Sequence, residues 1–195
     1  MAKKLLYGKG VNDSDEFVRE CGKIDQIYCH WANMMCRCFS IKYAKRRTLC
    51  DGCDVCEEWM IFSNFKRWCK SSESGYVDGY CLDKDILVSN NKIYSPETCC
   101  FVPKEINTII NKQKRQRGSL PIGVTKYNNR YLSQISKHKK RIFLGYFDTP
   151  EDAFLAYKRE KEAYIKEVAQ KYYDNGEITK RVYDALMKYE VEITD

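Results

Sequence analysis

Two aspartates on either side of a lysine are the first side chains in this chain that could perform chemistry. Asp83, Lys84 and Asp85 lie in a segment whose apolar residues are typical of a β-strand. Because successive strand residues point to opposite faces, we expect Asp83 and Asp85 to share one face and Lys84 to take the other. Paired carboxylates suit a divalent cation. They could equally line the solvent face of an exposed hairpin and bind nothing.

The segment around this pair, Tyr80 to Asn107, has a distinct order of elements. The pattern predicts a strand over 81–88, a turn at Asn90 and Asn91, and a returning strand over 92–94. A helix follows, and Asn107 is the last polar residue marked in it. The order is therefore a strand with acidic residues, a turn, a second strand and a helix with an amide side chain.

The sequences LDKDIL, NKIYSPETC and FVPKEIN resemble the HNH endonucleases, which have a ββα-metal fold, and in particular the homing-type enzymes of bacteriophages. This resemblance implies that Asp83 and Asn107 hold one divalent cation, Mg²⁺ or Mn²⁺, against the scissile phosphate of DNA. Asp85 would be a second ligand or would orient the attacking water. Two carboxylates and one amide oxygen make an all-oxygen site that suits magnesium.

Lys84 stands where the family has the histidine that acts as general base. Lysine titrates near 10.4, so about 4 to 5 kcal/mol would be needed to hold it neutral at pH 7, and a charged lysine cannot accept a proton. Two interpretations follow. Either the protein cleaves DNA without the histidine, with Lys84 stabilising phosphate charge, or it is a catalytically inactive DNA-binding protein. The inactive protein would act as a regulator or as a viral antagonist of a host defence nuclease.

Cysteine is frequent, with eleven residues in a chain of 195. Cys50, Cys53 and Cys56 follow CxxCxxC spacing, and such a cluster can form one half of a structural zinc site. A second pair at a familiar spacing is missing, and free cysteine is among the most buried residue types. A structural zinc ion and a group of buried thiols are therefore alternative predictions.

Apolar residues recur at helical spacing in two segments before Asp83. The first segment begins at Asp25, which has the character of an N-cap, and it carries His30, for which we expect packing in preference to a ligand role. The apolar positions are Ile27, Trp31, Met34, Met35 and Cys38 in the first segment and Val55, Trp59, Phe62, Phe65 and Cys69 in the second. Residues 1–24 show no period, so we expect an extended or loosely packed arm.

The second half of the chain predicts three short strands, PIGVTKY, RYLSQIS and KRIFLGYFD, and one long helix. The helix has Thr149 as N-cap, Pro150 at its first position and acidic residues in its first turn. The sequences IGVTKY and LGYFDTPEDAFLAY resemble the DNA-binding domain of plant ethylene-response factors, which also occurs fused to phage HNH enzymes. The resemblance implies double-stranded DNA as the partner, with the sheet in the major groove.

Strand alternation predicts which residues of the sheet meet the helix and which face DNA. The residues expected on the helix side are Tyr131, Ser133, Ile135, Ile142 and Leu144, against Ala153, Ala156 and Tyr157. The residues expected to contact DNA are Thr125, Tyr127, Arg130, Gln134, Ser136, Lys139, Lys140, Arg141 and Phe143. The cations suit phosphates, and Arg141 or Gln134 could read a purine edge. An RNA-binding module is less favoured, because the sequence shows few aromatic residues for stacking.

The net charge of +7 is concentrated in one segment. Ten cations and no acidic residue lie between Asn111 and Phe147, namely Lys112, Lys114, Arg115, Arg117, Lys126, Arg130, Lys137, Lys139, Lys140 and Arg141. A local basic segment on a slightly acidic body favours nucleic acid as the partner. The chain has no apolar run near 18 residues and no signal-peptide pattern, so we expect no membrane contact and a cytoplasmic location, in an infected bacterial cell if the phage resemblance holds.

The predicted fold class is α+β, with an HNH-like ββα-metal module followed by a three-stranded antiparallel sheet packed on a long helix. The predicted organisation is an arm at 1–24, the HNH-like domain at 25–111, a basic linker at 112–119, the ethylene-response-factor-type domain at 120–174 and a C-terminal helix at 175–195. This last helix is expected to fold back after Asn175 and Gly176, and partner binding is its minor alternative.

Overall fold

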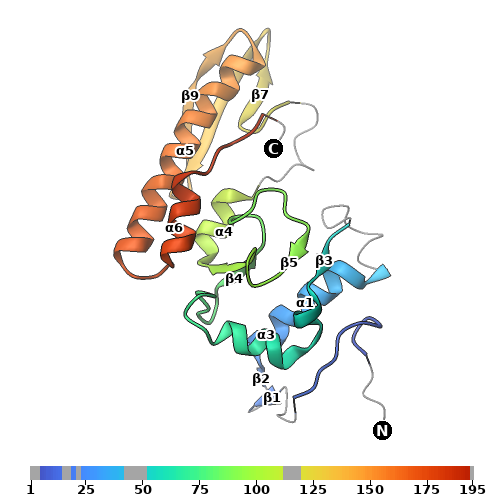
Figure 1. Cartoon of the computed structure of the whole chain (residues 1–195). Helices are drawn as coiled ribbons and strands as arrows, with labels where there is room; N and C mark the ends of the chain where they lie inside the picture. Colours follow the sequence, from blue (N-terminus) through green and yellow to red (C-terminus); the bar gives the residue numbers. More distant parts are fainter. Residues whose placement is uncertain (1–4, 15–18, 21–22, 42–51, 112–119, 194–195) are drawn as a thin grey trace. The chain divides into compact units, whose positions relative to one another are not determined.

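The computed structural model describes residues 5–14, 19–20, 23–41, 52–111 and 120–193 (Figure 1). The chain divides into two compact units, Met1–Lys104 and Glu105–Asp195. Unit 1 holds β1 (Arg19–Glu20), β2 (Lys23–Ile24), α1 (Gln26–Phe39), β3 (Asp54–Val55), the 3₁₀ helix η2 (Glu57–Met60), α3 (Phe62–Cys69), β4 (Cys81–Asp83), β5 (Ile93–Tyr94) and β6 (Cys100–Val102). Helix α4 (Lys104–Ile110) leads into unit 2, which holds β7 (Val124–Tyr127), β8 (Arg130–Lys137), β9 (Lys140–Phe147), α5 (Pro150–Asp174) and α6 (Lys180–Met187). The fold is α+β.

Helix α1 begins where the sequence predicts. The carboxylate of Asp25 accepts a hydrogen bond from the backbone N–H of Ile27 at 2.8 Å, which satisfies one of the free donors at the helix start. Four residues of the apolar stripe of α1 are buried, namely Ile27, Trp31, Met34 and Met35. Trp31 also donates its indole N–H to the carbonyl of Trp59 at 2.7 Å, so α1 is fixed to η2 by a buried hydrogen bond as well as by packing.

The second predicted helix is interrupted at Ile61. Residues 57–60 form η2, Ile61 is extended with φ −101° and ψ 122°, and α3 starts at Phe62. The physical reason is a neighbouring segment, because Val11 donates its N–H to the carbonyl of Met60 at 2.8 Å and accepts the N–H of Phe62 at 3.0 Å. This bridge holds Ile61 outside the helix.

Residues 6–13, within the segment predicted as an extended or loosely packed arm, contact the rest of unit 1. Gly10 is buried, and Leu6 packs against the core of unit 1. Asp13 accepts hydrogen bonds from the backbone N–H of Ser63 at 2.9 Å and from its hydroxyl at 2.7 Å. The segment is held by backbone and side-chain bonds to η2 and α3.

The core of unit 1 is built mainly from aromatic rings. Trp59 lies 5.0 Å from Phe65 and 4.6 Å from Trp68, centroid to centroid, and Trp68 lies 5.6 Å from Phe101. His30 packs against Phe101 with ring centroids 5.0 Å apart, and burial lowers the pKa of its imidazole. The predicted packing role of His30 is confirmed.

The strand pairing near Asp83 differs from the predicted hairpin. Strand β4 pairs with β6 in an antiparallel ladder, in which Cys81 is opposite Val102 and Asp83 is opposite Cys100. Strand β5 pairs instead with β3, in parallel. All three residues of β6 are buried and lie directly before α4, so the chain order remains strand, strand, helix. The second strand is β6 and not the predicted segment 92–94.

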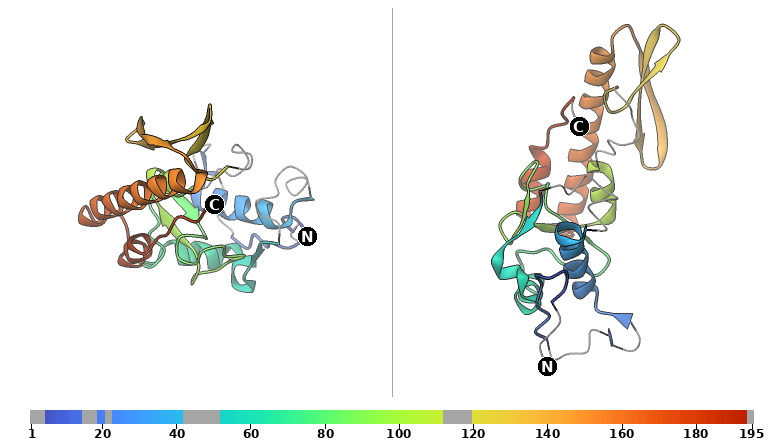
Figure 2. Two further views of the ribbon diagram at one scale, coloured as in Figure 1. Left: turned by 90° about the horizontal axis from the view of Figure 1, so that it is seen from above. Right: turned by 90° about the vertical axis from the view of Figure 1, so that its right-hand side faces the viewer.

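Unit 2 confirms the three predicted strands and the long helix. The strand order is β7-β8-β9, both pairs are antiparallel, and α5 runs along one face of the sheet (Figures 1 and 2). The core between them contains Val124, Ile135, Ala153, Phe154, Tyr157 and Val191, with Tyr131, Leu144 and Phe147 packed against it. Ile142, expected on the helix side, is 39% exposed.

The ends of α5 follow local signals. Thr149 accepts the N–H of Asp152 at 3.1 Å, and Pro150 occupies the first helical position, as predicted. At the other end Gly176 has φ 70°, a conformation that glycine adopts easily, and the chain reverses there. Helix α6 then packs on α5, where the Tyr173 and Tyr183 rings stack with centroids 4.4 Å apart.

Candidate metal centre and candidate nucleic-acid interface

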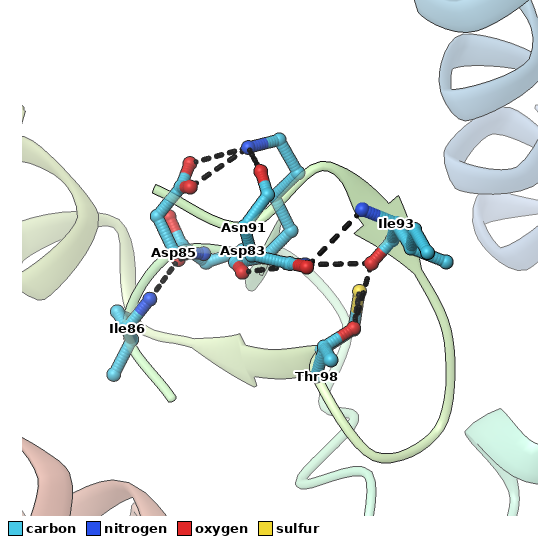
Figure 3. Close-up of polar contacts among 8 residues, drawn as sticks. Asp83, Asp85, Ile86, Asn91, Ile93 and Thr98 are labelled. Carbon is cyan, nitrogen blue, oxygen red and sulfur yellow. Dashed lines mark hydrogen bonds and ion pairs between the residues drawn. The ribbon is translucent and has the colours of Figure 1, made fainter. Parts of the chain in front are cut away.

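Asp83 ends strand β4 and closes the turn that follows (Figure 3). Its Oδ1 accepts the backbone N–H groups of Asp85 and Ile86, both at 2.8 Å. Local bonding of this kind competes with a strand ladder, which is why the strand stops here and does not reach Val88. The alternation that would place Asp83 and Asp85 on one face therefore does not apply, and that prediction is wrong.

The carboxyl group of Asp83 is held in a desolvated position. Burial raises its pKa above the usual range, and this effect outweighs the two N–H donors, which lower the pKa. The charge of Asp85 also raises the pKa, and that of Lys84 lowers it. A carboxylate whose charge is incompletely compensated is a suitable ligand for a cation.

Lys84 does not point away from the aspartates, contrary to the prediction. Its Nζ donates to both carboxylate oxygens of Asp85, at 2.7 and 2.9 Å, and to the carbonyl of Asn91 at 2.6 Å (Figure 3). The Lys84 side chain is 12% exposed, against 48% for Asp85. Lys84 therefore donates hydrogen bonds to three acceptors, which is the opposite of what a general base does.

Asn91 stabilises the loop that carries these charges. Its amide group donates to the carbonyls of Lys84 at 3.0 Å and Ile93 at 2.6 Å, and its Oδ1 accepts the N–H of Ile93 at 3.1 Å. Thr98 adds a hydroxyl hydrogen bond to the Ile93 carbonyl at 2.7 Å. Asn91 was predicted only as a turn residue. Its three bonds explain how an irregular loop keeps Lys84 and Asp85 in place.

Asn107 lies on α4 and is half-buried. It belongs to unit 2, whereas Asp83 belongs to unit 1. Within the described part of the chain no three His, Cys, Asp or Glu side chains gather in a way that could hold a metal ion. Among those residue types the candidate centre therefore offers one carboxylate, Asp83, and a second, Asp85, that is bonded to Lys84.

The cysteine cluster is described for two of its three members. Cys53 is buried in the aromatic core of unit 1, and Cys56 is half-buried and packs against that core. Burial raises the pKa of Cys56, which disfavours the thiolate that zinc requires. Cys50 lies outside the described residues, so the choice between zinc and buried thiols stays a prediction.

The predicted DNA-contacting residues lie on β7, β8, β9 and the turn between β8 and β9. All of them are exposed except Gln134, which is half-buried. The register places Thr125 opposite Leu132, and Leu132 opposite Tyr146, so these three lie on the same face of the sheet. Since Val124 is in the core, Thr125 and its partners lie on the face turned away from α5, which we call the outer face (Figure 2).

The cations of this region differ in their partners. Lys137 forms an ion pair with Glu160 of α5. Arg130 pairs with Asp148 at 3.1 Å, but these side chains are 54% and 85% exposed, so the pair is weak. His138 and Lys139 form the turn itself, with φ values of 49° and 63°. Arg141, Lys139 and Lys140 are exposed and could contact phosphates.

Tyr146 belongs to the outer face, although strand alternation from the turn places it on the helix side. A β-bulge at Leu144 causes the difference. On β8 the adjacent residues Ser133 and Gln134 are opposite Gly145 and Phe143 of β9, so Leu144 between them has no residue opposite it. The Tyr146 ring lies 5.4 Å from that of Tyr127 and 5.0 Å from that of Phe143, between centroids. Gly145, a glycine inside a strand, was the sequence signal for this bulge.

None of the family models, curated proteins or solved structures compared with this chain matches it. In the described residues no helix is long and apolar enough to cross a membrane. The function is therefore inferred from the chemistry and geometry of the two sites.

Proposed function

We propose that the protein binds DNA through the outer face of the β7-β8-β9 sheet. The observation that carries this proposal is the charge of the exposed sheet: residues 124–147 contain six Lys or Arg and no Asp or Glu. Among the described residues, the ion pairs of this segment are Lys137 with Glu160, Arg130 with the exposed Asp148, and His138 with Glu167. A polyanion is the partner that such a surface favours.

We further propose that the Asp83 region is the hydrolytic centre of a metal-dependent DNA endonuclease or nickase. Asp83 fits the role of a cation ligand, because its desolvated carboxylate has a raised pKa that an added positive charge would lower. Bound Mg²⁺ or Mn²⁺ would polarise the phosphate and activate water. Asp85 fits less well as a ligand, since both its oxygens accept hydrogen bonds from Lys84.

In this proposal the protein's own groups orient and neutralise. The N–H groups of Asp85 and Ile86 fix Oδ1 of Asp83, which leaves Oδ2 as the atom free to turn toward a cation. Lys84 would exchange its bonds with Asp85 for a phosphate oxygen, because a phosphate approaching the loop competes for the same ammonium group. Lys84 would then stabilise the charge of the phosphate and would not accept a proton.

The alternative is a catalytically inactive DNA-binding protein, a regulator or an antagonist of a host defence nuclease. One observation favours it: Lys84 stands where the base would be, and it is surrounded by three hydrogen-bond acceptors. Lys84 is a hydrogen-bond donor in all three contacts, so it does not take the place of the missing base.

A nicking assay separates these two functions. Supercoiled plasmid is incubated with the full chain and Mg²⁺ or Mn²⁺, beside the variants Asp83→Asn and Asp78→Ala. The asparagine keeps the Oδ1 acceptor that closes the turn, removes the charge and replaces Oδ2, the proposed ligand atom, by an NH2 group that cannot bind a cation. Asp78 is an exposed carboxylate of the same unit whose described partner is the hydroxyl of Tyr76, so its variant is the matched control.

Nicking by the native chain and by Asp78→Ala, but not by Asp83→Asn, is the result expected of a nuclease. Equal nicking by all three proteins would show that Asp83 is not the cation ligand. If none of them nicks plasmid while all three bind DNA, the inactive DNA-binding protein is the correct function. If the native chain neither binds nor cuts DNA, both functions are wrong.

A further inference from the structure

Three aromatic rings gather on the outer face of the sheet. Tyr127 comes from β7, and Phe143 and Tyr146 come from β9. The Tyr146 ring is the centre of the group, with centroid distances of 5.4 Å to Tyr127 and 5.0 Å to Phe143. The exposed fractions are 54% for Tyr127, 56% for Phe143 and 42% for Tyr146. We call these residues the outer aromatic cluster.

The cluster exists because of the bulge in β9. Phe143 and Tyr146 are three positions apart, an odd separation that places side chains on opposite faces of a regular strand. The unpaired Leu144 shifts the alternation by one residue, so that both rings lie on the outer face. The backbone accommodates the shift at Gly145, whose φ is 144°. The bulge thus converts two separated rings into one surface.

The cluster is not part of the core. The core between the sheet and α5 is formed by other residues, and Figure 2 shows no element of unit 2 on the outer face within the described chain. A contiguous exposed aromatic surface with a polar rim is typical of an interaction site. The rim is basic, since Arg130 donates to the carbonyl of Tyr146 at 3.3 Å and Arg141 lies exposed two residues before Phe143.

We propose that the outer aromatic cluster binds single-stranded DNA by stacking unpaired bases on its rings, with the phosphates held by the basic rim. This rests on the proposed binding of DNA by the sheet, and it specifies the form of DNA. Flat apolar rings beside cations match the two parts of a nucleotide, a base and a phosphate. In a duplex the base faces are covered by their neighbours, so the rings would meet only base edges. Unpaired bases expose the faces that the cluster can cover.

The orientation of the rings supports the same partner. The Tyr146 ring is tilted by 33° against that of Tyr127 and meets that of Phe143 edge-to-face at 60°. Bases that stack on differently oriented rings cannot stay parallel to one another as they do in a duplex. A strand that is already unpaired can adopt this arrangement without losing base pairs.

The test uses the full chain and fluorescence anisotropy with three labelled oligonucleotides of one length. The first is a single strand of mixed sequence, the second is its duplex, and the third is a single strand in which tetrahydrofuran abasic sites replace the bases. The abasic strand keeps every phosphate and removes the groups that stack. The variants are Phe143→Ala with Tyr146→Ala, and Tyr146→Phe as the control that keeps the ring. Circular dichroism spectra and melting curves verify that each variant folds.

The expected result is tighter binding of the single strand than of the duplex or the abasic strand at the same salt concentration. Because stacking of one base contributes a factor of about 5 to 150 in affinity, the double alanine variant should bind the single strand at least about tenfold more weakly. It should bind the abasic strand as the native chain does. Tyr146→Phe should leave all three affinities unchanged.

Two results would overturn the inference, and they differ from the failure of the proposed function. Equal or tighter binding of the duplex, with no effect of the double alanine variant on either form, would show that the rings do not stack with bases while DNA binding itself stands. Equal affinity for the abasic and the normal single strand would show that only phosphates are bound. Binding of none of the three oligonucleotides by the native chain would refute the proposed DNA binding as well.

Discussion

The attachment of the sheet to α5 depends on one glycine, and its replacement should be severe. Gly123 lies directly before β7 and has a φ of 79°. A Cβ added at this position would lie 2.0, 2.3 and 2.6 Å from three atoms of the Tyr157 ring. Tyr157 is 5% exposed and forms part of the core between α5 and the sheet. Gly123→Ala therefore combines backbone strain with a clash against a rigid buried ring.

The free energy of the substitution can be estimated from these two effects. A non-glycine residue in the left-handed region costs about 1 to 2 kcal/mol. Overpacking of a well-packed core costs about 1 to 3 kcal/mol more, because Tyr157 cannot move without shifting its neighbours. We expect a loss of about 2 to 5 kcal/mol, a large part of the about 5 to 15 kcal/mol by which a domain is stable.

The matched control is Gly176→Ala. Gly176 has a φ of 70°, but a Cβ there would meet nothing within 4 Å, so only the backbone effect of about 1 to 2 kcal/mol remains. Guanidinium unfolding followed by far-UV circular dichroism measures both variants, since α5 is the longest helix described. If Gly123→Ala destabilises the protein no more than Gly176→Ala does, the close packing of Gly123 on Tyr157 is not a feature of the molecule in solution.

Three further changes have measurable consequences. The double variant Lys139→Ala, Lys140→Ala tests the turn between β8 and β9. If each lysine contacts one phosphate, the slope of log affinity for DNA against log salt should decrease in magnitude by about two. An unchanged slope would show that this turn is not part of the interface. Thr149→Ala removes the acceptor of the Asp152 N–H and should lower the free energy of unfolding by about 1 kcal/mol. Thr149→Ser keeps a hydroxyl acceptor and should retain the native stability. Equal denaturation midpoints for the two variants would contradict the capping role. Burial raises the pKa of the Cys99 thiol from 9.0 to about 12, so between these values the folded state holds a proton that the unfolded state has lost. The free energy of unfolding should then fall as pH rises from about 9 to 12, by up to about 1.4 kcal/mol per pH unit for this group. Cys99→Ala should reduce that slope, and an identical slope in titrations of the two proteins would show that this thiol does not titrate as expected.

Much of unit 2 is predictable from its sequence because the signals are local. The Thr149 cap, Pro150 at the first helical position and the alternation of β7 and β8 each depend on residues only a few positions apart. The same is true of Asp25 at the start of α1. These elements form where their sequence patterns place them, since tertiary packing agrees with the local preference.

The region around Asp83 is less predictable because side-chain bonding competes with the strand pattern. An apolar segment with alternating acidic residues has the character of a strand, yet Asp83 bonds to the two N–H groups that would extend the ladder. The partner of β4 is then β6, and even the pair nearest in sequence, Asp83 and Cys100, is seventeen positions apart. Sequence patterns carry no information on which of two strands, β5 or β6, takes that place.

The sequence by itself determined the α+β class, the starts of α1 and α5, the three strands of unit 2 and the basic charge of that segment, because each follows from periodicity, capping residues or composition. Only the tertiary structure decided the partners of β4 and β5, the ion pair of Lys84 with Asp85, and the gathering of Tyr127, Phe143 and Tyr146 on one face. These features depend on contacts between residues distant in the chain and on a single bulge, which reverses the side-chain alternation of every residue after it.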